Sequence, residues 1–305
     1  MQDGSRKAVI AALVANAGIA VAKFVGFLIT GATSMLAESI HSVADSSNQG
    51  LLLLGGSRAR RRADTEHSFG YGRERYFWSF VVALVIFTLG SLFALFEGWE
   101  KIRHPHELES AEVAVGILLV AIVLETFSLR TAIKESNHVR GEQSWWSFIR
   151  RSKVPELPVV LLEDIGAEVG LCFALAGIGL AEITGNARFD AVGTLAIGVL
   201  LGVIAVILMI EMKGLLIGES ATPEMVAKIR GAVEGDPDVQ RLIHMRTQHL
   251  GPDEVLVAVK VELDADLAFR QVAEAIDRVE ASVRTSCPEA KIIYIEPDVT
   301  RPVPA

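Results

Sequence analysis

Apolar residues along this chain gather into six long stretches separated by short polar connections. The stretches cover residues 8–30, 33–55, 77–98, 112–133, 158–182 and 190–214. Each is close to the roughly 20 mostly apolar residues that a helix needs to cross a bilayer. The pattern therefore predicts a membrane-embedded all-α bundle of six transmembrane helices within residues 1–217.

The pattern changes after this region. Apolar residues recur at helical spacing in residues 223–235 and 265–287, and strands are predicted at residues 241–251, 255–264 and 291–299. The order α-β-β-α-β is typical of a small ferredoxin-like domain. We therefore predict a cytoplasmic α+β domain in residues 218–305.

Lysine and arginine lie mainly in alternate connections, in residues 58–75 and 130–153. Because such residues favour the cytoplasmic side, both termini are predicted to be cytoplasmic, with the protein in a cell inner or plasma membrane. The first apolar stretch is longer than the core of a secretory leader, so we interpret it as a span. Residues 145–151 combine aromatic and basic side chains, which predicts a short interfacial helix or simple aromatic anchoring.

Composition narrows the function further. The chain is 51% hydrophobic, and its formal net charge of −8 argues against a nucleic-acid partner. Its two cysteines, Cys172 and Cys287, form no CxxC pair. A cysteine zinc cage and a disulfide framework are therefore excluded.

The second apolar stretch holds residues that lipid would not tolerate. They are Glu38, His41, Asp45, Asn48 and Gln49. Ionisable groups at bilayer depth cost several kcal/mol, so each is a candidate functional residue. Spacings of three and four place residues 38, 41, 45 and 48 on one helical face, where His41 and Asp45 can reach one ion. Hydrogen bonding between helices, without an ion, is the alternative.

The fifth apolar stretch adds Glu163, Asp164 and Glu168. Residues 164 and 168 share a face, while residue 163 is turned by about 100°. So many acidic groups in a dry bundle require a cation, protons, or both. We therefore predict a divalent metal site formed by His41, Asp45 and Asp164.

Other acidic residues lie in or near these stretches. Glu125 and Glu97 are further candidates, and Glu97 is close to a predicted membrane interface. Asp190 begins the last stretch, where an acidic residue is typical of a helix cap.

At these residues the chain resembles the cation diffusion facilitator family of zinc transporters. The HxxxD pattern of its second span matches His41 to Asp45, and further matches occur at residues 67–72 (HSFGYG), at Asp190 and at residues 246–252 (RTQHLGP). The strings SMLAESIHSVADSSNQ and VVLLEDIGAEVG are similar to the zinc-transporter-nine-like branch. The resemblance implies a homodimeric, proton-coupled metal transporter with six spans and a ferredoxin-like domain. It implies no enzyme activity and no prosthetic group.

One departure from the family pattern concerns the fifth span. The family's histidine four residues before Asp164 is Val160 here, so a fourth ligand is missing. The candidates to replace it are Glu163, Glu168, Glu38, Asn48 and water. A site richer in oxygen leaves manganese, cobalt and iron(II) open as cargo beside zinc.

Two further departures lie outside the spans. Of the family's auxiliary site, Asp64 and His67 remain but the last histidine is Tyr71, so a turn that packs the loop is the favoured interpretation. In the tail domain, the positions of zinc-binding histidines hold Ile243, Lys260, Tyr294 and Glu296. We therefore predict a dimer contact there rather than a zinc cluster, with His244 and His249 as surface residues.

The predicted mechanism is alternating access, in which metal binding releases protons and protonation expels metal. Histidine titrates near physiological pH, so His41 is the natural coupling group. Arg73 and Glu219 are predicted to form a gating salt bridge. The rival functions are an intramembrane metalloenzyme, a scaffold with a polar core, and a channel; the first would need a second ExxH motif, which no other predicted span holds.

Overall fold

The computed structural model describes the backbone of residues 3–105 and 111–299. Within those ranges, the side chains of residues 3–16, His41, Ala44, Asp45 and Ile86 lie outside the described part. The chain divides into two compact units, and each is considered separately. The first contains residues 1–57 and 76–213, and the second contains residues 58–75 and 214–305.

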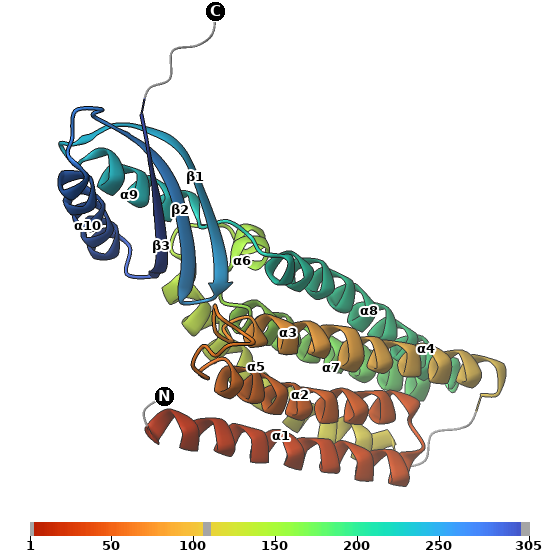
Figure 1. The fold of residues 1–305 in the computed structure, drawn as a ribbon. Helices are drawn as coiled ribbons and strands as arrows, with labels where there is room; N and C mark the ends of the chain where they lie inside the picture. The colour runs from red at the N-terminus through yellow and green to blue at the C-terminus, as the bar shows by residue number, and fades with distance from the viewer. Residues whose placement is uncertain (1–2, 106–110, 300–305) are drawn as a thin grey trace, which may run out of the picture. The chain divides into compact units, whose positions relative to one another are not determined.

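Long helices lying side by side form the first unit (Figure 1). The helices are α1 (Asp3–Thr30), α2 (Thr33–Arg58), α3 (Glu74–Val81), the π-helical segment η1 (Val82–Phe87), α4 (Thr88–Arg103), α5 (Ala111–Arg140), α6 (Trp145–Arg151), α7 (Glu156–Thr184) and α8 (Arg188–Ile217). All six predicted apolar stretches are helical, the third as α3, η1 and α4 in succession. The short helix predicted between the fourth and fifth stretches is also confirmed, as α6.

The prediction of six membrane spans is confirmed only in part. Among the described residues, three helical stretches are long and apolar enough to cross a bilayer, at residues 74–103, 111–140 and 188–217. Residues 17–30 of α1 form a shorter apolar helix. Helices α2 and α7 contain the acidic residues of the predicted metal site.

Asp190, at the start of α8, caps the N-terminus of α2. Its Oδ2 accepts hydrogen bonds from Thr33 N at 3.0 Å and Thr33 Oγ1 at 2.9 Å, and its Oδ1 accepts from the Ser34 amide and hydroxyl. The carboxylate thus satisfies backbone N–H groups that a helix start leaves unpaired. The predicted capping role is therefore seen, but on a helix more than 150 residues away in sequence.

The tail domain contains α9 (Pro223–Glu234), β1 (Val239–Gly251), β2 (Glu254–Leu263), α10 (Phe269–Ser286) and β3 (Ala290–Asp298). This is the predicted order of helices and strands. Strand β2 lies in the centre of the sheet, antiparallel to β1 and parallel to β3. Helices α9 and α10 cover one face (Figure 1). Alternate residues of β2, from Val255 to Val261, point into the core beneath these helices.

One prediction for the tail domain is wrong. His249, expected at the surface, is fully buried near the end of β1, with Nδ1 3.2 Å from the Gly251 carbonyl oxygen. Its amide also donates to the Glu219 carbonyl oxygen at 2.8 Å. The chain folds back between these residues and buries the ring. His244, in contrast, is exposed as predicted.

The loop of residues 58–75 packs against the tail domain. Arg75 Nη1 lies 3.1 Å from Asp253 Oδ2 in the turn between β1 and β2. A Cβ atom on Gly72 would lie 2.7 Å from the Leu250 carbonyl oxygen, so the two backbones touch at a point where only glycine fits.

We expect the thiol of Cys287 to react slowly with maleimide at pH 8. Both cysteines are free, and burial raises the pKa of the Cys287 thiol, as does its 3.5 Å hydrogen bond to Glu289. Since the thiolate is the nucleophile, the rate should rise about tenfold per pH unit below that pKa. Mass spectrometry in a Cys172→Ser background would measure the rate. Glu289→Gln should speed labelling at pH 8 in this background, and an unchanged rate would contradict the assigned cause.

Candidate functional site

Helix α2 carries a buried polar face. The predicted ligands His41 and Asp45 lie on successive turns of this helix, and their side chains are outside the described part of the chain. At about 100° of rotation per residue, their backbone positions share a face with Glu38, Ser42 and Asn48. Glu38, Ser42 and Asn48 are all buried.

Helix α7 directs three of its carboxylates, Glu163, Asp164 and Glu168, toward two neighbouring helices. Asn48 of α2 donates a hydrogen bond to Glu163. Ser128 Oγ of α5 lies 3.2 and 3.1 Å from the two Asp164 oxygens. Thr126 Oγ1, two residues before Ser128 on α5, lies 3.0 Å from Glu168 Oε1. The rotation predicted between residues 163 and 164 thus directs the first to α2 and the second to α5.

The Asp164 carboxylate keeps capacity for a cation. A hydroxyl carries one proton, so Ser128 can satisfy only part of the acceptor capacity of a buried carboxylate. Val160, one turn before Asp164, offers no ligand atom and is half-buried. The absence of the family's histidine therefore leaves an apolar side chain one turn from the carboxylate.

Glu38 lies between α1 and α7. Its Oε2 accepts a hydrogen bond from Lys23 Nζ of α1 at 3.1 Å, and Lys23 also donates to Ser42 Oγ at 2.8 Å. On the opposite side, a Cβ atom at Gly170 of α7 would lie 2.6 Å from Glu38 Oε1. Glycine at this position makes room for the carboxylate between α1 and α7.

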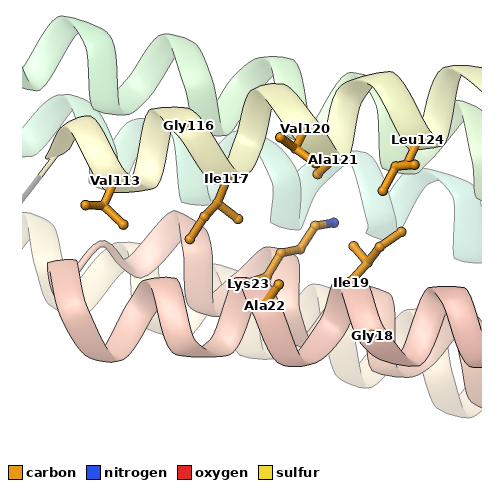
Figure 2. A pocket seen from close by; sticks show the side chains of 10 residues that line it. All are labelled: Gly18, Ile19, Ala22, Lys23, Val113, Gly116, Ile117, Val120, Ala121 and Leu124. Carbon is orange, nitrogen blue, oxygen red and sulfur yellow. The ribbon is translucent and has the colours of Figure 1, made fainter.

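Sequence reasoning missed Lys23, which is fully buried. The sequence did carry a signal, because Lys23 is a lone lysine inside the first apolar stretch. A lysine can extend its ammonium group to the membrane interface only from a position near the end of a span. Figure 2 shows the Lys23 side chain between α1 and α5, where it lines a cavity of about 660 Å³ together with Ile19, Ala121 and Leu124. The other lining residues are Gly18, Ala22, Val113, Gly116, Ile117 and Val120, so the cavity wall is otherwise apolar.

Several buried oxygens in this region have no hydrogen-bond donor among the described side chains and backbone. They are Glu38 Oε1, Asn48 Oδ1, Gln49 Oε1 and Glu168 Oε2. A buried polar atom without a partner costs free energy unless an ion, a proton or water satisfies it. No group of three metal-ligating side chains occurs within the described residues, from which His41 and Asp45 are missing. The predicted metal site therefore stays a prediction.

Comparison with known families covers nearly the whole chain. Residues 9–217 match the family model described as the cation efflux transmembrane domain, and residues 221–298 match that of the cation efflux protein cytoplasmic domain. The chain belongs to the cation efflux family. Proteins of this family are transporters, so the metalloenzyme alternative is set aside.

Curated relatives of this cation efflux protein include proteins from animals, plants and bacteria. The mouse (Mus musculus) protein named proton-coupled zinc antiporter SLC30A9, mitochondrial, is 33% identical over 90% of this chain and 49% of its own length. The metal tolerance protein C4 of Arabidopsis thaliana is 28% identical over 90% of this chain and 61% of its own length. The cation-efflux pump FieF of Klebsiella pneumoniae is 26% identical over 99% of this chain and 94% of its own length. The chain thus spans about half the length of the animal relatives it matches.

Comparison with solved structures gives matches over part of the chain. A structure of the MamM C-terminal domain is 22% identical, with a TM-score of 0.24, and covers 25% of this chain and 92% of its own. The tail domain of this family member has a three-stranded sheet of order β1-β2-β3.

Asp64 and His67, the residues that remain of the predicted auxiliary metal site, lie in a hydrogen-bonded turn. Asp64 Oδ1 accepts from the amides of Glu66 at 3.1 Å and His67 at 2.7 Å, and Tyr71 donates to Oδ2 at 2.6 Å. The Tyr71 hydrogen bond, and then the His67 amide, hold the pKa of Asp64 below its ordinary value. His67 Nδ1 is 3.8 Å from Asp64 Oδ1, and the centroids of the His67 and Tyr71 rings lie 4.4 Å apart, with the ring planes tilted by 32°. These contacts favour the packed turn over a metal site.

The predicted gate, Arg73 with Glu219, also stays a prediction. Arg73 Nε is buried, with no hydrogen-bond partner in the part of the chain that the structure describes. The Glu219 backbone is tied to His249 of β1, and its side chain lies close to Gly214.

Proposed function

We propose that this cation efflux protein carries a divalent metal cation, zinc foremost, across a membrane in exchange for protons. The observation that carries the proposal is the set of three carboxylates that α7 directs toward α2 and α5: Glu163 and Asp164 are buried, and Glu168 has an unsatisfied oxygen. Such a set favours a bound cation or proton. The names of the relatives, zinc antiporter and cation-efflux pump, support the same cargo class.

The ion is proposed to bind His41 and Asp45 of α2 and Asp164 of α7. For the fourth ligand, the contact between Asn48 and Glu163 favours this pair, because the Asn48 carbonyl oxygen is buried without a donor. Glu168 is a second source of an unsatisfied carboxylate oxygen. A ligand set with one nitrogen and several oxygens suits zinc and also admits manganese, cobalt or iron(II).

Transport is proposed to follow alternating access in a homodimer. Six spans would place both termini and the tail domain on the cytoplasmic side of a cell inner or plasma membrane. Metal binding requires deprotonated ligands, so protons and the metal ion compete for the same side chains. Protons that enter from the side of release would therefore displace the ion there. The cation efflux cytoplasmic domain at residues 221–298 supports the dimer.

Proteoliposome uptake with and without a pH gradient tests this proposal. The wild-type protein is expected to take up zinc faster with the gradient, and His41→Ala, Asp45→Ala and Asp164→Ala should each lower uptake by at least about 100-fold, since each removes a direct ligand. Uptake of manganese, cobalt and iron(II) in parallel would rank the cargo.

The matched control is Glu182→Ala, which removes an exposed carboxylate from the same helix as Asp164. It should transport as the wild type does. Normal transport by all three ligand variants would overturn the proposed site. Uptake that is indifferent to the gradient would indicate a channel rather than an antiporter.

A further inference from the structure

The buried Lys23 of α1 is unusual because its stability contribution does not explain its presence. Lys23 and Glu38 both have fully buried side chains, and their charged atoms lie 3.1 Å apart. Removing two charges from solvent is costly, and well-packed apolar residues at such positions are often as stable or more so. A positively charged side chain within a helix bundle therefore suggests a functional role.

Lys23 contacts α2 next to the predicted metal ligands. Its two partners, Glu38 and Ser42, lie one helical turn apart on α2. Ser42 directly follows His41, and Asp45 lies three residues after Ser42. The ammonium group is thus bonded to the turn of α2 that carries the first predicted ligand and leads to the second.

Lys23 also determines what Glu38 can do. Glu38 is held between the Lys23 ammonium on α1 and Gly170 on α7. Without the Lys23 ammonium, the buried Glu38 carboxylate would have no compensating charge, and a divalent ion bound at the polar face of α2 could supply it. With the lysine present, this charge is already balanced.

We propose that Lys23 is a tethered cation that positions the polar face of α2 and keeps Glu38 out of the set of metal ligands. The inference rests on the proposed transport function. It assigns Glu38 to Lys23 and leaves the fourth ligand to the other candidates. By withholding one carboxylate, Lys23 limits how tightly the ion is held, which permits its release on the far side.

The predicted result concerns Lys23→Met in zinc uptake by proteoliposomes. Without its Lys23 partner, Glu38 can bind the zinc ion as an additional ligand, so the half-saturating zinc concentration should fall about tenfold. The maximal rate should fall by a similar factor, because tighter binding of the cargo slows its release. A merely structural defect would lower the maximal rate without tightening the binding.

Three further variants sharpen the test. Lys23→Arg keeps the charge and should retain both transport parameters within about threefold. Adding Glu38→Gln to Lys23→Met removes the freed carboxylate, and both parameters should return toward the wild-type values. Lys101→Met removes another buried lysine, on α4, and should not tighten zinc binding.

Each outcome decides the proposal. Wild-type half-saturation in Lys23→Met, or a double variant as altered as Lys23→Met, would overturn it. If Lys23→Met fails to fold, Glu38→Gln alone decides, because a rise of tenfold or more in half-saturation would make Glu38 a metal ligand. Absence of wild-type uptake for every metal would overturn the transport function and the inference with it, whereas uptake that no Lys23 variant alters overturns the inference alone.

Discussion

Replacing Asp190 by alanine is expected to destabilise the helical unit by on the order of 3 kcal/mol, because buried donors to a carboxylate would lose their acceptor. The Asp190 side chain is fully buried and accepts from the amides and hydroxyls of Thr33 and Ser34. Alanine would leave the first turn of α2 with unsatisfied N–H groups in an apolar surrounding. Since α2 carries His41 and Asp45, transport should fall together with stability.

Thermal unfolding in detergent would measure this effect, with tryptophan fluorescence as the signal. Asp190→Asn keeps the shape and one acceptor oxygen, so its loss should be smaller than that of Asp190→Ala. Glu182→Ala, which removes an exposed carboxylate near the end of α7, should leave the unfolding temperature unchanged. If all three variants unfold at the wild-type temperature, Asp190 does not stabilise the start of α2.

Gly193→Val is expected to prevent α7 and α8 from packing. A Cβ atom on Gly193 of α8 would lie 2.8 Å from the Phe173 carbonyl oxygen and 3.4 Å from the Gly177 Cα, both on α7. These are backbone atoms, so the helices themselves must separate. Since α7 carries Asp164, we expect little folded protein and no metal uptake.

The matched control is Gly179→Val on α7. No atom of the described residues lies within 4 Å of a Cβ atom at this position, and the cost to the helix of a β-branched residue is similar. Size-exclusion chromatography of a fluorescent fusion would compare the yields of folded protein. Equal yields for the two variants would show that the Gly193 contact does not determine helix packing.

Periodicity along the chain predicted the helices and the strands well. The α-β-β-α-β order of the tail domain needed only the spacing of apolar residues such as those in β2, where alternate valines face the core. Residues 145–151 likewise form the expected short helix. These features depend on neighbours in sequence, which explains why a single sequence suffices to predict them.

Contacts between distant residues were harder to predict. His249 was expected at the surface, yet the fold of the chain back toward Glu219 buries it. The partner of Asp190 was expected on its own helix and lies instead on α2. Neither contact has a local signature, because each joins segments that only the fold brings together.

The sequence by itself determined the family, the helical elements and the tail domain's order of helices and strands, since each rests on local spacing or a contiguous motif. It also marked Glu163, Asp164 and Glu168 as unusual for a span. Only the tertiary structure decided that Glu163 faces α2, that Asp164 and Glu168 face α5, and that Lys23 donates a hydrogen bond to Glu38. The physical reason is that a buried charge must find its partner in space, and that partner lies on another helix.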